Sequence, residues 1–274
     1  MTDIRNKTVW ITGASSGIGA ALAKTASEAG ANVILSGRRL EALDEVARSL
    51  VGPNLTLPFE ATDYPALGTV VEQAWNWQGQ VDVLINNAGI SQRSIAMETT
   101  PEVYQHLLDV DLLAPIWLTQ LQLERMAAVG GGHIVAISSV AGRIGAPMRT
   151  AYSAAKHGLI GYMDALRCEV ETLHNIHVTN ILPGSVATNV SRNALTADGS
   201  KRLRSDDIID AGDDPLDCAR AILDAIKTNT NELIYAKDNE LELAKLRHAD
   251  PDTFFEAIAG YGAQTVLALQ QENS

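Results

Sequence analysis

The sequence predicts an α/β fold in which helices cover both faces of a doubly wound parallel sheet. Two observations lead to this prediction. Short β-branched runs alternate with longer helical patterns along most of the chain, and 274 residues, 46% of them hydrophobic and 20% charged, are enough to bury one large core. When strands and helices alternate in this way, the strands pair in parallel and the helices form right-handed crossovers between them. Such sheets bind ligands at the carboxyl ends of their strands.

Seven runs have the composition of buried strands, which predicts a seven-stranded sheet: 8–11, 33–35, 55–59, 81–85, 133–137, 176–181 and 233–235. Six segments show helical periodicity: 20–29, 40–50, 67–77, 101–129, 152–173 and 216–227. The polar stretch 189–214 lacks clear periodicity, so we expect a mobile loop or short helices that act as a lid. Residues 237–274 follow an Ala-rich helical pattern and predict a C-terminal extension, packed on the subunit or on a neighbour.

The overall composition narrows the possible partners and the compartment. A formal net charge of −12 argues against a nucleic acid or an anionic membrane as partner, because both select for basic patches. No apolar run reaches the roughly 20 residues that span a bilayer. The chain has two cysteines and no charged and apolar leader at its start, so a cytoplasmic location is expected. No metal is expected, because no shared ligand spacing relates His106, His133, His157, His174 and His177.

Tyr152 and Lys156 lie four residues apart in a predicted helix. This spacing places a phenol and an ammonium group one turn apart on the same helical face. The cation stabilises a phenolate, so the phenol can act as an acid or base near neutral pH. Ser139 adds a hydroxyl that could hold a carbonyl or alcohol oxygen. By itself, however, this spacing more often belongs to two surface residues of a helix.

A glycine-rich loop follows the first predicted strand and leads into the first predicted helix. It reads Thr12-Gly13-Ala14-Ser15-Ser16-Gly17-Ile18-Gly19, a GxxxGxG spacing. Glycines permit a tight turn and let backbone N–H groups approach a phosphate at the N-terminus of a helix. The loop therefore predicts a nucleotide site, and the alternative is an ordinary glycine turn.

Arg38 and Arg39 follow the second predicted strand. An NAD site prefers an acidic residue here for the ribose hydroxyls, whereas a guanidinium group suits the additional phosphate of NADP. Arg38 therefore favours NADP(H) over NAD(H). The alternative, a solvated charge at the start of a helix, suits Arg39 better than Arg38.

Five separated motifs occur together along the chain. They are the loop 12–19, Asn86-Asn87-Ala88-Gly89, Ser139, the pair Tyr152 and Lys156, and Pro183-Gly184-Ser185-Val186-Ala187-Thr188. With these motifs, residues 5–236 closely resemble classical short-chain dehydrogenase/reductases, and most of all their dehydrogenase/reductase member 7 group. The resemblance implies a single Rossmann-like dinucleotide-binding and catalytic domain over residues 1–274. It also implies hydride transfer between NAD(P)(H) and a small carbonyl or alcohol substrate.

The resemblance assigns a role to each matched residue. Tyr152 would donate the proton in reduction and act as the base in oxidation, Lys156 would bind the nicotinamide ribose, and Ser139 would polarise the substrate oxygen. Val186 and Thr188 would hold the carboxamide. Other cofactor contacts would come from Gly13, Ser15, Ser16, Gly17, Ile18, Gly19, Arg38, Arg39, Asn87, Ala88, Gly89, Pro183 and Gly184.

Asp111 and Glu60 depart from the family pattern. The family usually has asparagine at position 111, where it anchors a water for proton relay. A carboxylate near Lys156 would instead offset part of the cation's stabilisation of the phenolate. The alternative is that residue 111 acts only through its backbone carbonyl. Glu60, followed by Ala61, takes the place of an aspartate that contacts adenine, and it can accept from the adenine amino group with a longer arm.

The expected substrate cleft follows the fourth, fifth and sixth strands and contains Gln92, Arg93, Arg143, Met148 and Arg149. The three arginines could select an anionic carbonyl compound, or they could be solvated or paired with acids.

The predicted helices 101–129 and 152–173 are where the family pairs its subunits, so a homodimer or homotetramer is expected. Two other functions stay open. One is a non-catalytic NADP(H)-binding sensor or scaffold, which Asp111 favours. The other is an NAD-dependent alcohol dehydrogenase, against which Arg38 argues.

Overall fold

Seven parallel strands form one sheet in the computed structural model, which describes residues 1–272, with side chains to residue 269. The strands are β1 (Thr8–Thr12), β2 (Asn32–Gly37), β3 (Asn54–Pro58), β4 (Val83–Asn86), β5 (Gly132–Ile137), β6 (Ile176–Pro183) and β7 (Glu232–Tyr235). Their order is β3-β2-β1-β4-β5-β6-β7, and each neighbouring pair is parallel. The predicted doubly wound fold is confirmed. Its winding reverses between β1 and β4, where such sheets bind ligands.

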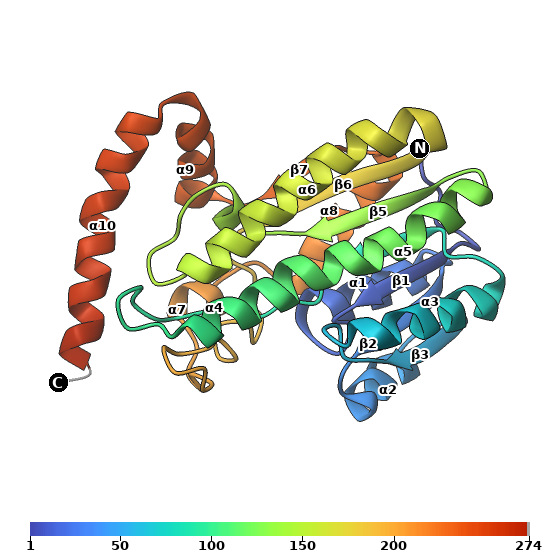
Figure 1. Ribbon diagram of the computed structural model, residues 1–274, viewed down its shortest axis with the longest axis horizontal. Coiled ribbons are helices and arrows are strands. Elements are labelled where there is room, and N and C mark those ends of the chain that lie inside the picture. The colour runs from blue at the N-terminus through green and yellow to red at the C-terminus, as the bar shows by residue number, and fades with distance from the viewer. Residues whose placement is uncertain (273–274) are drawn as a thin grey trace.

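Alternate residues of each strand face opposite layers of helices. Val9 and Ile11 of β1 enter one core, and Trp10 between them enters the other. The first core is closed by α1 (Gly17–Glu28), α2 (Leu40–Arg48) and α8 (Pro215–Thr228). The second is closed by α3 (Tyr64–Gln78), α5 (Ala114–Ala128) and α6 (Thr150–His174), and Figure 1 shows α5 and α6 crossing the same face. Because both faces are covered, the central strands β1 and β4 are buried along their whole length.

The predicted helix 101–129 is not one regular α-helix, and this part of the prediction is wrong. The chain forms α4 (Pro101–Leu108), a π-helical turn η1 (Asp109–Leu113) and then α5. Pro115 explains the change, because it has no N–H to donate to the carbonyl of Asp111 and its ring crowds that carbonyl. The turn widens, and the N–H of Ala114 bonds the carbonyl of Asp109, five residues back. Asp111 lies in the middle of this widened turn.

A mostly irregular stretch follows β6, and two helices follow β7. The stretch 189–214 contains a short helix, α7 (Asp207–Asp210), as the expectation of short helices allowed. After β7 come α9 (Asp238–Ala249) and α10 (Pro251–Glu272), and α10 lies beside the body of the molecule rather than on the sheet (Figure 1). Within residues 1–272, no helix combines the length and apolar character needed to cross a membrane.

Candidate active site

The glycine-rich loop connects β1 to α1 at the carboxyl edge of the sheet. Gly13 and Gly17 have φ angles of +66° and +55°, a region that glycine enters without strain. A Cβ atom on Gly19 would lie 2.3 Å from the carbonyl oxygen of Gly13, so no side chain fits there. Ser16 precedes α1 in an extended conformation, and its side chain makes no capping bond. The first N–H groups of α1 are therefore left for a ligand, which fits the diphosphate of a dinucleotide.

The run from Asn86 to Gly89 is fastened to this loop. Nδ2 of Asn87 donates to the carbonyl oxygens of Thr12 and Gly13, at 2.9 Å and 3.3 Å. The backbone N–H groups of Asn87 and Ala88 both donate to Oγ1 of Thr12, at 3.0 Å. The fold thus joins two predicted motifs that are 75 residues apart in sequence.

Arg38 and Arg39 lie exposed at the carboxyl end of β2, next to the glycine loop. Nη2 of Arg39 donates to Oγ of Ser15 at 3.4 Å, although the sequence favoured a solvated role for this arginine. Nη1 of Arg38 lies 3.7 Å from Oε2 of Glu60. Oε1 of Glu60 also accepts from the N–H and the hydroxyl of Thr62. Two cations therefore stand beside the loop, one of them facing a carboxylate.

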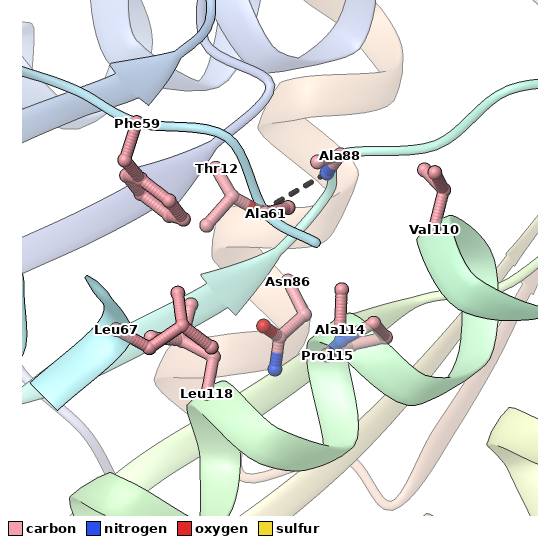
Figure 2. Close-up of a pocket in the computed structure, with 10 residues that line it drawn as sticks. All are labelled: Thr12, Phe59, Ala61, Leu67, Asn86, Ala88, Val110, Ala114, Pro115 and Leu118. Carbon is pink, nitrogen blue, oxygen red and sulfur yellow. Dashed lines mark hydrogen bonds between the residues drawn. The ribbon is translucent and has the colours of Figure 1, made fainter. Parts of the chain in front are cut away.

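A small, mostly apolar pocket opens between the end of β3 and the start of α5, as Figure 2 shows. Its walls are Thr12, Phe59, Ala61, Leu67, Asn86, Ala88, Val110, Ala114, Pro115 and Leu118. Walls of this chemistry fit a flat ring such as adenine. Ala61 lines the pocket, whereas Glu60 turns toward Arg38 and Thr62. Sequence reasoning missed Phe59 and Pro115, because they come together only where the segment after β3 and the start of α5 line the same pocket.

Tyr152 and Lys156 lie one turn apart on α6, and Nζ of Lys156 is 5.6 Å from the centre of the Tyr152 ring. Ser139 follows β5 and begins the short 3-10 helix η2 (Val140–Gly142). Its Oγ accepts from the N–H of Ala141 at 3.1 Å and donates to the carbonyl of Pro183 at 3.3 Å. The end of β5 and the start of α6 therefore carry the three predicted catalytic side chains.

Lys156 is buried and pairs with Asp111. Its Nζ lies 3.2 Å from Oδ2 of Asp111 and donates to the carbonyl of Ile137 at 3.2 Å. Asp111 is 1% exposed, and its Oδ1 accepts from the N–H of Ile90 at 2.8 Å. A Cβ atom on Gly89 would lie 3.2 Å from Oδ2 and 3.3 Å from Nζ, so glycine at this position gives the charged groups room. The Asp111 side chain is therefore engaged with Lys156 and Ile90, and its part in the reaction stays a prediction.

Burial and charge oppose each other in this pair. Burial alone favours the neutral amine of Lys156, but the Asp111 carboxylate and Tyr152 outweigh it and raise the pKa of Lys156. Burial also raises the pKa of Asp111, and the ammonium group offsets only part of that effect. Lys156 is therefore a cation at neutral pH.

The turn from Pro183 to Thr188 closes the site after β6. The N–H of Ala187 donates to the carbonyl of Asp213 at 2.9 Å, and Val186 is buried. A Cβ atom on Gly17 would lie 3.1 Å from Cγ2 of Thr188, so this turn lies against the glycine loop. The residues predicted to hold the diphosphate and the carboxamide are therefore neighbours.

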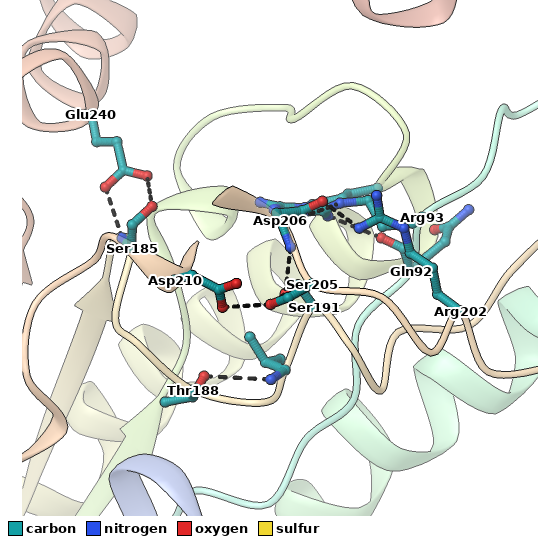
Figure 3. A network of polar contacts seen from close by, with 12 residues as sticks. Gln92, Arg93, Ser185, Thr188, Ser191, Arg202, Ser205, Asp206, Asp210 and Glu240 are labelled. Carbon is teal, nitrogen blue, oxygen red and sulfur yellow. Dashed lines mark hydrogen bonds and ion pairs between the residues drawn. The ribbon is translucent and has the colours of Figure 1, made fainter. Parts of the chain in front are cut away.

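The three arginines named for the substrate cleft are paired with carboxylates. Arg93 and Arg149 both reach Asp206, as does Arg202, and Figure 3 shows Arg93 and Arg202 converging on it. Arg143 pairs elsewhere, with a glutamate of β7. The paired alternative is confirmed, and the stretch 189–214 is tied to the segment after β4 and to the residue before α6.

Gln92 does not line a cleft, and this expectation is wrong. Its side chain is fully buried, and Oε1 accepts from the N–H of Ala151 at 2.8 Å. Its Nε2 donates to Ser94 and Thr99. Gln92 therefore anchors the first turn of the helix that carries Tyr152.

Comparison with known proteins shows which family has this sequence and fold. A family model described as short chain dehydrogenase matches residues 7–199. The chain belongs to the short-chain dehydrogenase/reductase family. This is a family of oxidoreductases, so the prediction from the five motifs is confirmed.

Relatives of this short-chain dehydrogenase/reductase support the member 7 resemblance. Dehydrogenase/reductase SDR family member 7B of Bos taurus is 38% identical over 265 residues, which are 93% of this chain and 81% of that protein. The Danio rerio protein of the same name is 37% identical over 266 residues, 94% of this chain and 86% of that protein. The predicted subgroup is therefore confirmed as well.

Solved structures show the same short-chain dehydrogenase/reductase fold. A short-chain dehydrogenase from Streptomyces avermitilis superposes with a TM-score of 0.79 at 28% identity, over 94% of this chain and 98% of that one. A short chain dehydrogenase/reductase from Burkholderia phymatum, solved in complex with NAD, superposes with a TM-score of 0.80 at 20% identity, over 92% and 96% of the two chains. The second likeness concerns the fold alone.

Proposed function

We propose that this protein is an NADP(H)-dependent oxidoreductase that transfers hydride between the cofactor and a small carbonyl or alcohol substrate. The observation that carries the proposal is the position of Tyr152 on α6, one helical turn from the buried cation Lys156, whose Nζ reaches the carbonyl of Ile137 at the carboxyl end of β5. A bound nicotinamide supplies or accepts the hydride. The protein then has to supply the proton, the orientation and the electrostatic field.

Tyr152 donates its phenolic proton to the carbonyl oxygen in reduction and removes the hydroxyl proton in oxidation. Lys156 stabilises the phenolate through its positive charge and binds the ribose next to the nicotinamide. The Ser139 hydroxyl now donates to the carbonyl of Pro183. By turning, it can donate to the substrate oxygen instead and polarise it.

The cofactor contacts follow the same edge of the sheet. Gly13, Gly17 and Gly19 leave room for the diphosphate, with Ser15, Ser16 and Ile18 between them. Asn87, Ala88 and Gly89 would contact the adenosine ribose, and Ala61 lines the pocket that would take the adenine. Pro183 and Gly184 lead into Val186 and Thr188, which hold the carboxamide and so decide which face of the nicotinamide meets the substrate.

Arg38 and Arg39 support NADP(H) as the cofactor. Both guanidinium groups stand at the end of β2, and a phosphate on the adenosine ribose would give Arg38 a stronger partner than the exposed Glu60 carboxylate. We expect Arg38→Ala to raise the KM for NADPH about tenfold and to change the KM for NADH much less. Arg48→Ala, which removes an exposed arginine at the end of α2, is the control.

A spectrophotometric screen of carbonyls and alcohols with NADPH and NADP⁺ tests the function. We expect Tyr152→Phe to lower kcat/KM about 1000-fold without weakening NADPH binding, because only the acid and base is lost. Tyr261→Phe, on the exposed face of α10, is the matched control. NADPH binding without turnover of any compound would favour the sensor or scaffold, and a preference for NADH would favour the NAD-dependent alcohol dehydrogenase.

We also propose that the subunits pair as a homodimer or homotetramer through α5 and α6. Trp117 and Leu121 on α5 are 44% and 40% exposed, and large apolar side chains of this kind fit an interface. Light scattering tests this proposal, because Trp117→Glu should give monomers, whereas Val51→Glu, at an exposed apolar residue after α2, should not.

A further inference from the structure

The C-terminal extension reaches back to the turn after β6 through one side chain, Glu240. Oε2 of Glu240 accepts from the backbone N–H of Ser185 at 2.8 Å, and Oε1 accepts from the hydroxyl of Ser185 at 2.8 Å. Figure 3 shows the carboxylate of α9 above Ser185 with both bonds. The two residues are 55 positions apart, and one carboxylate satisfies both donors of Ser185.

Gly184 leaves the space that this carboxylate occupies. A Cβ atom on Gly184 would lie 2.2 Å from Oε2 of Glu240 and 3.0 Å from the Cβ atom of Ala236. Gly184 is not among the glycines with positive φ, so its backbone conformation does not require glycine. The close approach of Glu240 does.

The extension is itself held in place beside the site. Phe254 of α10 and Ala244 of α9 pack against Val140 and Ile144, which follow Ser139. Phe254 is 1% exposed, so the start of α10 is a firm anchor for α9. The position of Glu240 is therefore coupled to the segment that carries Ser139.

The turn after β6 is also held by Asp213, which leaves the N–H and hydroxyl of Ser185 free to donate to Glu240. The N–H of Asp213 donates to the carbonyl of Ser185, and the N–H of Ala187 donates to the carbonyl of Asp213. Lys237, just before α9, pairs with the Asp213 side chain. The backbone carbonyl of Ser185 is thus held from one side, and its N–H and hydroxyl are held by Glu240 from the other.

We propose that Glu240 is a positioning residue that sets the turn from Pro183 to Thr188 for cofactor binding. The proposal rests on the proposed function, in which Val186 and Thr188 hold the carboxamide. Charge-assisted bonds to the N–H and hydroxyl of one residue fix both its backbone and its side chain. Without them the turn loses its register against the glycine loop, where Thr188 meets Gly17.

The first test uses the protein without cofactor. Hydrogen exchange of the peptide that contains Ser185 should be at least tenfold faster in Glu240→Ala than in the wild type, because the amide loses its acceptor. Glu242→Ala removes an exposed carboxylate from the same helix, one that pairs only locally with Lys245, and should leave this exchange unchanged. Equal protection of Ser185 in Glu240→Ala and the wild type would overturn the proposal.

The second test measures NADPH binding by its fluorescence. We expect Glu240→Ala to raise the Kd about tenfold, and Glu240→Gln, whose amide oxygen still accepts one bond, to raise it about threefold. The KM for NADPH should rise with the Kd, while kcat at saturating NADPH stays within threefold of the wild type. A Kd within twofold of the wild type in Glu240→Ala would overturn the role. If the wild type binds NADH instead, the proposed cofactor fails, and the same comparison with NADH still tests Glu240.

A double-mutant cycle distinguishes a specific coupling of Gly184 and Glu240 from a general loss of structure. Gly184→Ala should weaken NADPH binding about tenfold in the wild type by displacing the carboxylate, and much less in Glu240→Ala, where the carboxylate is gone and the wider contact with Ala236 remains. Additive effects of the two substitutions would contradict the coupling. Far-UV circular dichroism and Tm establish that each variant is folded.

Discussion

Asp111 and Asp206 are both partly or wholly buried carboxylates near the candidate site, and their surroundings differ. Asp111 is 1% exposed, and among the residues that the structure describes it lies within salt-bridge distance of one cation, Lys156. Asp206 is more exposed and receives Arg93, Arg149 and Arg202. One carboxylate faces one cation in a dry interior, and the other is shared by three.

The balance of burial and charge decides the pKa of each carboxylate. For Asp111, burial dominates and raises the pKa despite Lys156. Burial alone would also raise the pKa of Asp206, but the hydrogen bonds and charges of Arg93 and Arg202 outweigh it and lower the pKa. The difference separates two surroundings of aspartate: Asp111 raises the pKa of the buried Lys156, and Asp206 ties a loop to the rest of the fold.

Removing the Asp111 carboxylate is expected to have the largest effect. Asp111→Ala leaves the Lys156 ammonium buried without its partner, and we expect the free energy of unfolding to fall by about 4 kcal/mol. Urea unfolding measures this loss. Asp109→Ala, in the same π-helical turn, should change stability by less than about 1 kcal/mol. An equally small effect of Asp111→Ala would mean that the pair contributes nothing to stability.

Removing the Asp206 charge comes second. Asp206→Asn deprives the buried Arg93 guanidinium of its carboxylate, and we expect a loss of about 2 to 3 kcal/mol. The stretch 189–214 should also become more open to limited trypsin cleavage. Asp207→Asn removes the same charge one residue along, at an exposed position, and is the control. Unchanged cleavage in Asp206→Asn would mean that Asp206 does not hold this stretch in place.

His133 also makes the free energy of unfolding depend on pH, so its contribution has to be removed before the two aspartates are compared in acid. Burial, followed by the charges of His177 and the N-terminus, lowers the pKa of His133 to about 3. The unfolded chain therefore binds this proton at higher pH than the folded one, and stability is lost as pH falls below about 6.5. We expect a loss of about 2 kcal/mol between pH 7 and 5, measured by urea unfolding. His133→Gln should remove this part of the dependence between pH 7 and 5, and a slope as steep as that of the wild type in this range would contradict it.

In the His133→Gln background the two carboxylates should act with opposite sign. Asp206 has a lowered pKa, so its contribution is present above the unfolded value and is lost as pH falls through the folded value. Asp111 has a raised pKa, so stability falls as pH rises through its folded value. Asp206→Asn should therefore reduce the loss of stability that occurs as pH falls. Asp111→Asn should reduce the loss of stability that occurs as pH rises.

The smallest expected effect is a shift of the pH–rate profile. Asp111→Asn removes the charge that offsets Lys156, so we expect the profile to move to lower pH. The maximal kcat should change only a few-fold. Asp206→Asn should leave the profile in place. An unchanged profile in Asp111→Asn would refute its electrostatic role.

Local patterns account for what could be predicted. The strands were visible because parallel strands buried on both faces are continuous apolar runs, as in β1. The spacing of Tyr152 and Lys156 follows from the helical repeat, and the glycine loop follows from sterics. The π-helical turn at Asp111 also had a local signal in Pro115, which an unbroken helix over 101–129 overlooked.

Residues whose roles depend on distant partners could not be predicted in this way. Gln92 has the same side chain whether it lines a cleft or caps α6, and only the bond to Ala151 decides between them. The sequence left open whether Arg93 and Arg149 bind an anion or pair with acids, and only the fold shows that Asp206 is their partner. Glu240 lies beyond the recognisable motifs, and nothing in its surrounding sequence indicates Ser185.

The sequence by itself determined the order of the strands along the chain, the glycine-rich loop, the Tyr152 and Lys156 pair and the family, because each rests on spacings of a few residues or on local sterics. The tertiary structure decided which charges meet. Whether Asp111 reaches Lys156, and whether Glu240 reaches Ser185, depends on the packing of separate elements. Burial and neighbouring charge, which set the electrostatics of this site, exist only once the chain has folded.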